Sequence, residues 1–211
     1  MPYNLSTVRD NVRNKLDDDD YEQNFLDRAI NYAQWQITNK NQFSFMEDSE
    51  NLAIGLGDTE TSLPADFHEH LYLVLTSPVD VRANITNQYM DYKDFIDTYI
   101  DPSLNQAARP YYWSEYARAI KFANPADQAY TLRLDYLRKS PQLVNDSDVP
   151  DIPEEFQELL ELGAYMRIAK REDDYDVKSQ EQLDYNSLLL DLKHVYGRKK
   201  RPGGMRKMRV S

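Results

Sequence analysis

The spacing of apolar residues changes twice along this chain of 211 residues, and that change constrains the fold more than any other feature. Near the start, Val8, Val12 and Leu16 recur every four residues, as on one face of a helix. Between about residues 42 and 140, short apolar runs alternate with polar residues, as in half-buried strands. Helical spacing returns over 153–196. The pattern therefore predicts two helical ends that flank a β-rich middle.

The helical ends carry local signals that support this prediction. The first end, residues 7–40, is interrupted by the acidic run Asp17–Asp20. We interpret that run as favourable charge before the next helix, because it lacks the alternate spacing and the glycine of a calcium loop. The second end starts at Pro153, a residue suited to a first helical turn. Gly163 on its inner face would let another backbone approach closely, and Gly197 is placed to end the last helix.

The middle of the chain predicts a small antiparallel sheet. Residues 68–77 and 130–138 alternate as strands, and residues 48–51 are interpreted as the turn of a hairpin. The expected fold class is α+β, mainly α: an antiparallel helical bundle with a small antiparallel β insertion over 42–140. We expect one domain over 1–197, followed by a disordered basic C-terminal tail over 198–211.

Motifs that could support catalysis or cofactor binding are weak. The glycines of Gly55–Gly57 lack the following Lys-Ser/Thr of a phosphate loop. His68 and His70, with Asp66 before them, could ligate a metal, but exposed histidines at a strand entrance are the better interpretation. Pairs of carboxylates are inevitable among 36 acidic residues, so a glycan hydrolase is kept only as an alternative. We predict no enzyme activity, no cofactor and no metal site.

A run of aromatic residues in the middle of the chain is open to two interpretations. Tyr111, Tyr112, Trp113 and Tyr116 could stack on the bases of a single-stranded nucleic acid. Few basic residues lie among them, so we favour a place in the sheet core or at a subunit interface.

The absence of cysteine excludes disulfides and thiolate chemistry and favours a reducing compartment. The first residues lack the apolar run of a signal peptide, and no run is long enough to span a bilayer. We therefore expect a chain that is neither exported nor inserted in a membrane.

Charge divides the chain into two parts. The formal net charge is −11, yet seven of the 25 Lys and Arg residues fall in the last fourteen positions, where no acid occurs. The remaining 197 residues hold 18 basic against 36 acidic residues, a formal charge of −18. Such a body would repel nucleic acid, whereas the tail would attract phosphate or an acidic protein surface. The basic residues of the tail are Arg198, Lys199, Lys200, Arg201, Arg206, Lys207 and Arg209.

The order of several short motifs resembles the head-to-tail adaptors of tailed phages, of podovirus type and related kinds. A helical start is followed by LPADF at Leu63–Phe67 and by a proline-tyrosine element at Pro110–Tyr112. A strand, turn and strand then run from Ile120 to Leu143, and the helix EEFQELLELGAYMRIAKRED covers Glu154–Asp173. The resemblance covers about residues 20–196 and implies a ring of about twelve copies under the portal protein, with no cofactor.

Together, the resemblance and the charges predict a non-enzymatic virion protein at the head-tail interface, assembled in the host cytoplasm. Its expected partners are the portal, a downstream tail or nozzle protein, other copies of itself and duplex DNA that passes without sequence-specific binding. We expect the seven tail cations to bind the portal, and free copies to stay monomeric because their acidic bodies repel each other. A DNA-binding packaging or regulatory protein that acts through its tail is the main alternative.

Overall fold

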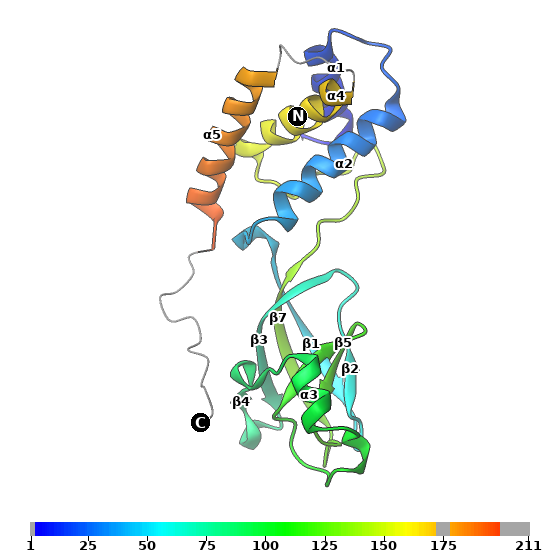
Figure 1. The fold of residues 1–211 in the computed structure, drawn as a ribbon, viewed down its shortest axis with the longest axis vertical. Helices are drawn as coiled ribbons and strands as arrows, with labels where there is room; N and C mark the ends of the chain where they lie inside the picture. The colour runs from blue at the N-terminus through cyan, green and yellow to red at the C-terminus, as the bar shows by residue number, and fades with distance from the viewer. Residues whose placement is uncertain (1–2, 172–177, 199–211) are drawn as a thin grey trace. The chain divides into compact units, whose positions relative to one another are not determined.

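The computed structural model describes residues 3–171 and 178–198, and the chain divides into two compact units (Figure 1). The helical unit comprises Met1–Met46 and Ser140–Ser211, and the β unit comprises Glu47–Lys139. The helical unit is thus built from an N-terminal and a C-terminal part of the chain, while the middle of the chain forms the β unit. That residues 1–197 act as one adaptor domain stays a prediction.

The described part of the helical unit contains four α-helices, of which α4 packs against the other three. Their apolar faces are buried together, as the spacing of Val8 and Val12 predicted. None of the helices in the described ranges is long and apolar enough to cross a membrane. The four helices are α1 (Leu5–Leu16), α2 (Gln23–Asn39), α4 (Glu158–Arg171) and α5 (Lys178–Tyr196).

Gly163 lies where α4 packs on α2. A Cβ atom added to this glycine would stand 2.9 Å from the Cβ of Ala33, and the Cα of Ala33 would be 3.8 Å from it. A larger residue would force the two helices apart, because packed interiors leave no spare room. The expected close approach of another backbone at Gly163 is confirmed.

The chain returns from the β unit through a segment without regular structure, residues 140–152, which we call the return segment. The side-chain amide of Asn31 donates to the carbonyl of Leu143 at 2.9 Å and accepts from its N–H at 2.8 Å. The amide of Gln34 donates to the carbonyl of Pro141 at 2.9 Å. The buried guanidinium of Arg9 pairs with Asp27 on α2 and with Asp146 at 2.6 Å. Polar side chains therefore hold the return segment against α1 and α2.

The described residues of the β unit form two antiparallel sheets, with strand orders β1-β7-β3-β4 and β2-β6-β5. A short helix, α3 (Tyr92–Thr98), lies beside β5. The strands are β1 (Glu47–Ile54), β2 (Glu60–Ser62), β3 (Phe67–Ser77), β4 (Ala83–Asn84), β5 (Trp113–Tyr116), β6 (Ala119–Phe122) and β7 (Tyr130–Arg138).

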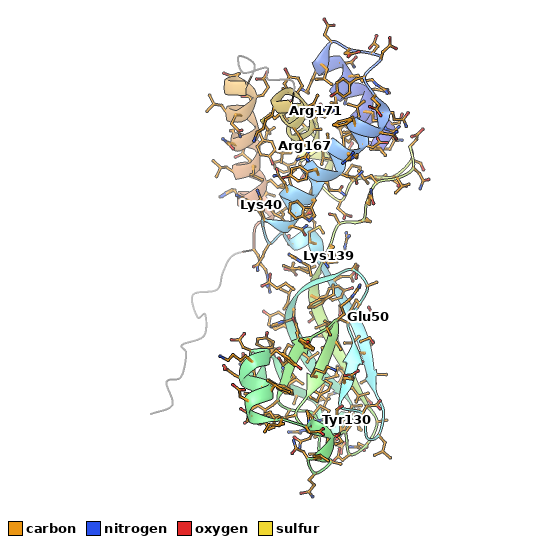
Figure 2. The ribbon with its side chains drawn as sticks, turned by 45° about the vertical axis from the view of Figure 1, so that its right-hand side comes forward. Lys40, Glu50, Tyr130, Lys139, Arg167 and Arg171 are labelled. Carbon is orange, nitrogen blue, oxygen red and sulfur yellow. The ribbon has the colours of Figure 1, made fainter. Side chains whose placement is uncertain are left out.

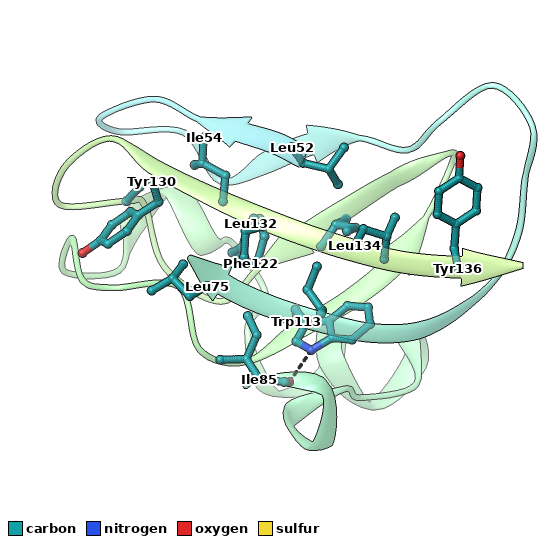
Figure 3. Close-up of a cluster of buried hydrophobic side chains, with 13 residues drawn as sticks. Leu52, Ile54, Leu75, Ile85, Trp113, Phe122, Tyr130, Leu132, Leu134 and Tyr136 are labelled. Carbon is teal, nitrogen blue, oxygen red and sulfur yellow. Dashed lines mark hydrogen bonds between the residues drawn. The ribbon is translucent and has the colours of Figure 1, made fainter. Parts of the chain in front are cut away.

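The β unit has a hydrophobic core of its own, shown in Figure 3. Trp113 is fully buried in it, and its indole N–H donates to the carbonyl of Ile85 at 2.8 Å. The alternate residues Leu132 and Leu134 of β7 point into the same cluster. Both sheets therefore contribute to one core, which is made of side chains from within Glu47–Lys139.

The expectation of a mainly helical bundle with a small β insertion is wrong. Seven strands in two sheets occupy the middle of the described chain, and they enclose a separate core. The sequence understated this part because several strands are short or polar. In β1 the residues 47–51 are all exposed, so they show no apolar alternation.

The hairpin expected around residues 48–51 is also wrong. These residues lie inside the continuous strand β1, which pairs with β7. Glu47 is opposite Leu137 at one end of this pairing, and Ile54 is opposite Tyr130 at the other. β1 is an edge strand, where charged residues are tolerated and discourage pairing with other chains. Polar composition thus indicated an exposed edge here and not a turn.

Candidate interaction surfaces

The root of the basic tail is fixed to the helical unit. Helix α5 ends at Tyr196, and the N–H of Gly197 donates to the carbonyl of Lys193 at 3.0 Å. The N–H of Arg198 then donates to the carbonyl of Gln42 at 2.9 Å. A Cβ atom on Gly197 would lie 2.1 Å from the Lys193 carbonyl oxygen, so this turn requires glycine. The prediction that Gly197 ends the helix is confirmed.

Tyr196 anchors this end of α5 from the side. Its ring packs edge-on against Phe45 and Phe156, at centroid distances of 5.6 and 6.2 Å. Its hydroxyl donates to the Glu155 carboxylate at 2.7 Å. That bond raises the pKa of Tyr196 and lowers the pKa of Glu155. The direction in which the chain leaves α5 is therefore set by packing as well as by the terminal turn.

A basic hollow surrounds the point where the tail leaves. Its volume is about 590 Å³, and its lining carries three cations and a histidine but no acid. Within the described ranges, neither Lys40 nor Lys193 forms an ion pair. We call this surface the exit hollow; it is lined by Lys40, Asn41, Gln42, Phe43, Lys193, His194, Gly197 and Arg198.

The structure places only one of the predicted portal-binding residues. Arg198 lies in the exit hollow, and the other six lie outside the described residues: Lys199, Lys200, Arg201, Arg206, Lys207 and Arg209. The exit hollow itself was not expected, because Lys40 and Lys193 are far apart in the sequence and meet only through the fold. No feature of either helix alone marks the hollow.

The aromatic run of the β unit divides between core and surface. Trp113 is buried, whereas Tyr111, Tyr112 and Tyr116 are 40, 41 and 51% exposed. Tyr116 stacks on Tyr92 of α3, with ring centroids 3.9 Å apart. Burial raises the pKa of Tyr99, and nearby Tyr112 adds to that shift. We call Tyr111, Tyr112 and Tyr116 the tyrosine surface. Ile100 and Leu104 of the β unit are also highly exposed.

The structure gives the two histidines near the start of β3 different surroundings. In the described part of the chain, no group of three or more His, Cys, Asp or Glu residues could hold a metal ion. His70 Nδ1 lies 2.7 Å from the Glu115 carboxylate, and the ring packs against Tyr89 and Trp113. His68 is exposed, and the pairing of β3 with β7 shifts register between Phe67 and Glu69, where His68 lies. Asp66 instead accepts a hydrogen bond from the hydroxyl of Tyr136 at 3.0 Å.

The carboxyl groups with a shifted pKa do not resemble a glycosidase acid. Such an acid needs a raised pKa. The pKa of Asp148 is lowered by the N–H groups of Val144 and Asn145, and the pKa of Glu155 is lowered by Tyr196. The hydrolase alternative therefore gains no support from either group.

An α+β chain whose notable surfaces are a basic exit point and an exposed tyrosine surface has the features of an assembly protein. A family model described as SU10 adaptor protein matches residues 3–207. The chain belongs to the SU10 adaptor protein family. No protein of known, curated function matches it.

The family agrees with the adaptor resemblance found in the sequence. The prediction of a phage head-to-tail adaptor with a structural role is confirmed at this level. The podovirus type, the portal contact and the ring stay predictions. The family match also spans both the helical unit and the β unit.

Proposed function

We propose that this chain is a structural head-to-tail adaptor of a tailed phage virion. It forms a ring under the portal, extends the channel for DNA and provides the platform for tail assembly. The observation that carries this proposal is the match to the SU10 adaptor family over residues 3–207. A family of adaptors also accounts for a chain whose main described features are candidate interaction surfaces.

The charges of the chain suggest how such a ring forms. The first 197 residues have a formal charge of −18, so free copies repel each other and stay monomeric. Assembly then depends on a template that gathers the copies. The portal supplies this template, and about twelve copies close the ring.

The basic end of the chain is the part that binds the portal. The exit hollow adds Lys40 and Lys193 to the tail cations, so positive charge extends from the tail onto the folded body (Figure 2 labels Lys40). A tethered tail raises the effective concentration of the body at the portal surface. Weak contacts between neighbouring copies are then sufficient to complete the ring. The portal-binding residues are Arg198, Lys199, Lys200, Arg201, Arg206, Lys207 and Arg209.

An acidic body also suits a channel for DNA. A wall that carries negative charge does not hold phosphates, so the duplex slides past it during packaging and ejection. The protein therefore sits in the virion at the head-tail interface, and the tail protein binds the opposite side of the ring.

The test is to mix the full chain with the portal protein of the same phage and to image the complexes by electron microscopy. Rings on the portal are expected, and removal of residues 199–211 should lower portal occupancy about tenfold or more. Thermal unfolding of the truncated chain should match that of the full chain. Copies that stay unbound at high concentration would overturn the proposal.

Charge variants of the exit hollow sharpen this test. Lys40→Glu and Lys193→Glu should each weaken portal binding, because each replaces an attractive charge with a repulsive one. Lys93→Glu makes the same change on an exposed residue of α3 and serves as the matched control. Equal losses in all three variants would mean that net charge, and not the exit hollow, governs binding.

The DNA-binding alternative predicts a different result. Duplex DNA would bind in a salt-sensitive manner and would be released when the tail is removed. Such binding, without any portal complex, would replace the adaptor proposal with a packaging or regulatory function.

A further inference from the structure

A second basic surface lies on the helical unit, between α2 and α4. The cavity has a volume of about 480 Å³ and is lined by four cations and no acid. A smaller hollow of about 330 Å³ shares Arg167 and Lys170 with it. We call this surface the basic cleft; its lining residues are Phe25, Arg28, Ala29, Arg167, Ile168, Lys170 and Arg171.

Aromatic rings on α2 hold two of the arginines in place. The guanidinium carbon of Arg167 lies 3.5 Å from the ring centre of Tyr32, and that of Arg171 lies 3.7 Å from the ring centre of Phe25. Figure 2 labels both arginines on the helical unit. A stacked guanidinium has a fixed plane, and its N–H groups point outward along that plane. The cleft therefore presents oriented donors that suit carboxylates.

The cations of the cleft have no acidic partner among the described residues. None of Arg28, Arg167, Lys170 and Arg171 forms an ion pair there, and all four are exposed. Lys170 and Arg171 lie in the last turn of α4, where positive charge favours the helix dipole. The helix dipole does not account for the positive charge of Arg28, which is on α2, or of Arg167, which lies one turn earlier on α4.

The acidic run Asp17–Asp20 supplies the complementary charge. All four of its residues are exposed, and none forms an ion pair within the described ranges. One copy thus carries a concentrated acidic segment and a concentrated basic cleft, and neither is neutralised in the part of the chain that the structure describes. We propose that the acidic run of one copy docks into the basic cleft of the next copy.

This contact is heterologous, since two different surfaces meet. A heterologous contact closes into a ring when the rotation from each copy to the next adds up to a full turn, and the proposed function requires such a ring. The inference rests on that proposed function for its biological setting. It also explains how bodies with a large negative charge come together: the four cations of the cleft lie where the neighbour's acids arrive.

A half-exposed tryptophan beside the cleft favours a protein as the occupant. Trp35 is 51% exposed and stacks on Tyr32 with ring centroids 5.7 Å apart. Exposed tryptophan and arginine are the residues most enriched at the centres of protein interfaces. Duplex DNA would present phosphates to the arginines but no apolar surface to Trp35.

The closing experiment uses the absence of cysteine from the chain. One set of full-length copies carries Asp19→Cys, and a second set, distinguished by a mass tag, carries Lys170→Cys. The two sets are mixed with a short bismaleimide cross-linker under two conditions. One mixture contains the portal, and the other is portal-free, at high protein concentration and low salt. Links between the two sets should exceed links within either set about tenfold. A copy with Lys93→Cys in place of Lys170→Cys is the control and should link at the background level.

Charge exchange then tests the pairing itself. Arg167→Glu should reduce the links about tenfold, and Asp18→Arg in the partner set should restore them. If rings form on the portal but no links between the sets appear, this inference is wrong while the proposed function stands. If no rings form, the portal-free mixture decides: links there support the contact, and their absence overturns it.

Two other occupants of the cleft give distinct results. Loss of duplex DNA binding in Arg167→Glu, without links between copies, would assign the cleft to phosphate. The sequence continues after Arg171 with Glu172, Asp173, Asp174 and Asp176, which lie outside the described residues. A further set of variants changes these four residues to Gln or Asn. Links between copies that appear only in these variants would show that the acidic residues after Arg171 occupy the cleft of their own copy, and would also overturn the proposal.

Discussion

The contacts that stabilise the β unit internally differ in kind from those that stabilise the helical unit. The β unit closes on an apolar core in which even the indole N–H of Trp113 is bonded inside the unit. The helical unit also has buried apolar faces, but its return segment is held by side chains such as Asn31, Gln34 and Arg9. Apolar burial changes little with pH or salt, whereas polar and charged contacts respond to both.

The two units also differ in the surface that they present. The helical unit carries the exit hollow and the basic cleft, both rich in cations and without an acidic residue in their lining. The β unit exposes tyrosines and apolar residues such as Ile100. We infer that charge guides assembly through the helical unit, while contacts of the β unit depend on apolar burial. Four substitutions test how far this contrast extends.

The largest effect is expected in the core of the β unit. Trp113→Ala removes a fully buried side chain and leaves the Ile85 carbonyl without its donor, so stability should fall by about 3 to 5 kcal/mol. The chain has one other tryptophan, Trp35, which is 51% exposed, and Trp35→Ala should cost about 0.5 kcal/mol or less. Urea unfolding followed by circular dichroism measures both. Equal losses would contradict the closed core of the β unit.

A pair of leucines tests whether α5 depends on the same kind of burial. Leu192 is fully buried, while Leu190, two residues earlier, is 65% exposed. Leu192→Ala should destabilise the helical unit by about 2 to 4 kcal/mol, and Leu190→Ala by about 0.5 kcal/mol or less. Thermal unfolding of the free chain distinguishes them. A large effect at Leu190 in the free chain would mean that α5 is covered on its outer side.

A third substitution removes one polar contact of the return segment. Asn31→Ala leaves both the N–H and the carbonyl of Leu143 without their partner, which should cost about 1 to 3 kcal/mol. Asn24→Ala, at an exposed position earlier in the same helix, is the matched control. Hydrogen exchange at Leu143 should speed up in the first variant only. Unchanged exchange would mean that the return segment is held without Asn31.

The sequence predicted the elements whose apolar residues repeat regularly. The strand expected at 130–138 is β7 with the same bounds, and the alternation in 68–77 matches β3. β1 was missed because Glu47 to Asn51 are polar and exposed, and their partners on β7 are far away in the sequence. Periodicity detects a buried face, but a strand at a sheet edge does not need one.

The candidate surfaces were predictable only where their residues are neighbours in the sequence. The tail cations are consecutive and were found, but the exit hollow requires Lys40 and Lys193 to meet through the fold. The basic cleft had a partial signal, since Arg167, Lys170 and Arg171 share one face of a helix. Arg28 joins them only because α2 packs against α4. The composition could not show which cations the fold would bring together.

The smallest effect concerns the pH dependence of the return segment. The carboxylate of Asp148 accepts from the N–H groups of Val144 and Asn145 at 2.7 and 2.8 Å, which lowers its pKa from the ordinary 3.8. Because the folded pKa is the lower one, this contribution is fully present above about pH 3.8 and is lost as the pH falls through the lowered value. Asp148→Asn should therefore be less stable than the natural chain near neutral pH, and the difference should shrink in acid. Asp191→Asn makes the same substitution at an exposed position of α5, outside the return segment, and serves as the matched control. A constant difference between the natural chain and Asp148→Asn across this range would mean that ionisation of Asp148 does not stabilise the segment, and the helical unit would then resemble the β unit in its response to pH.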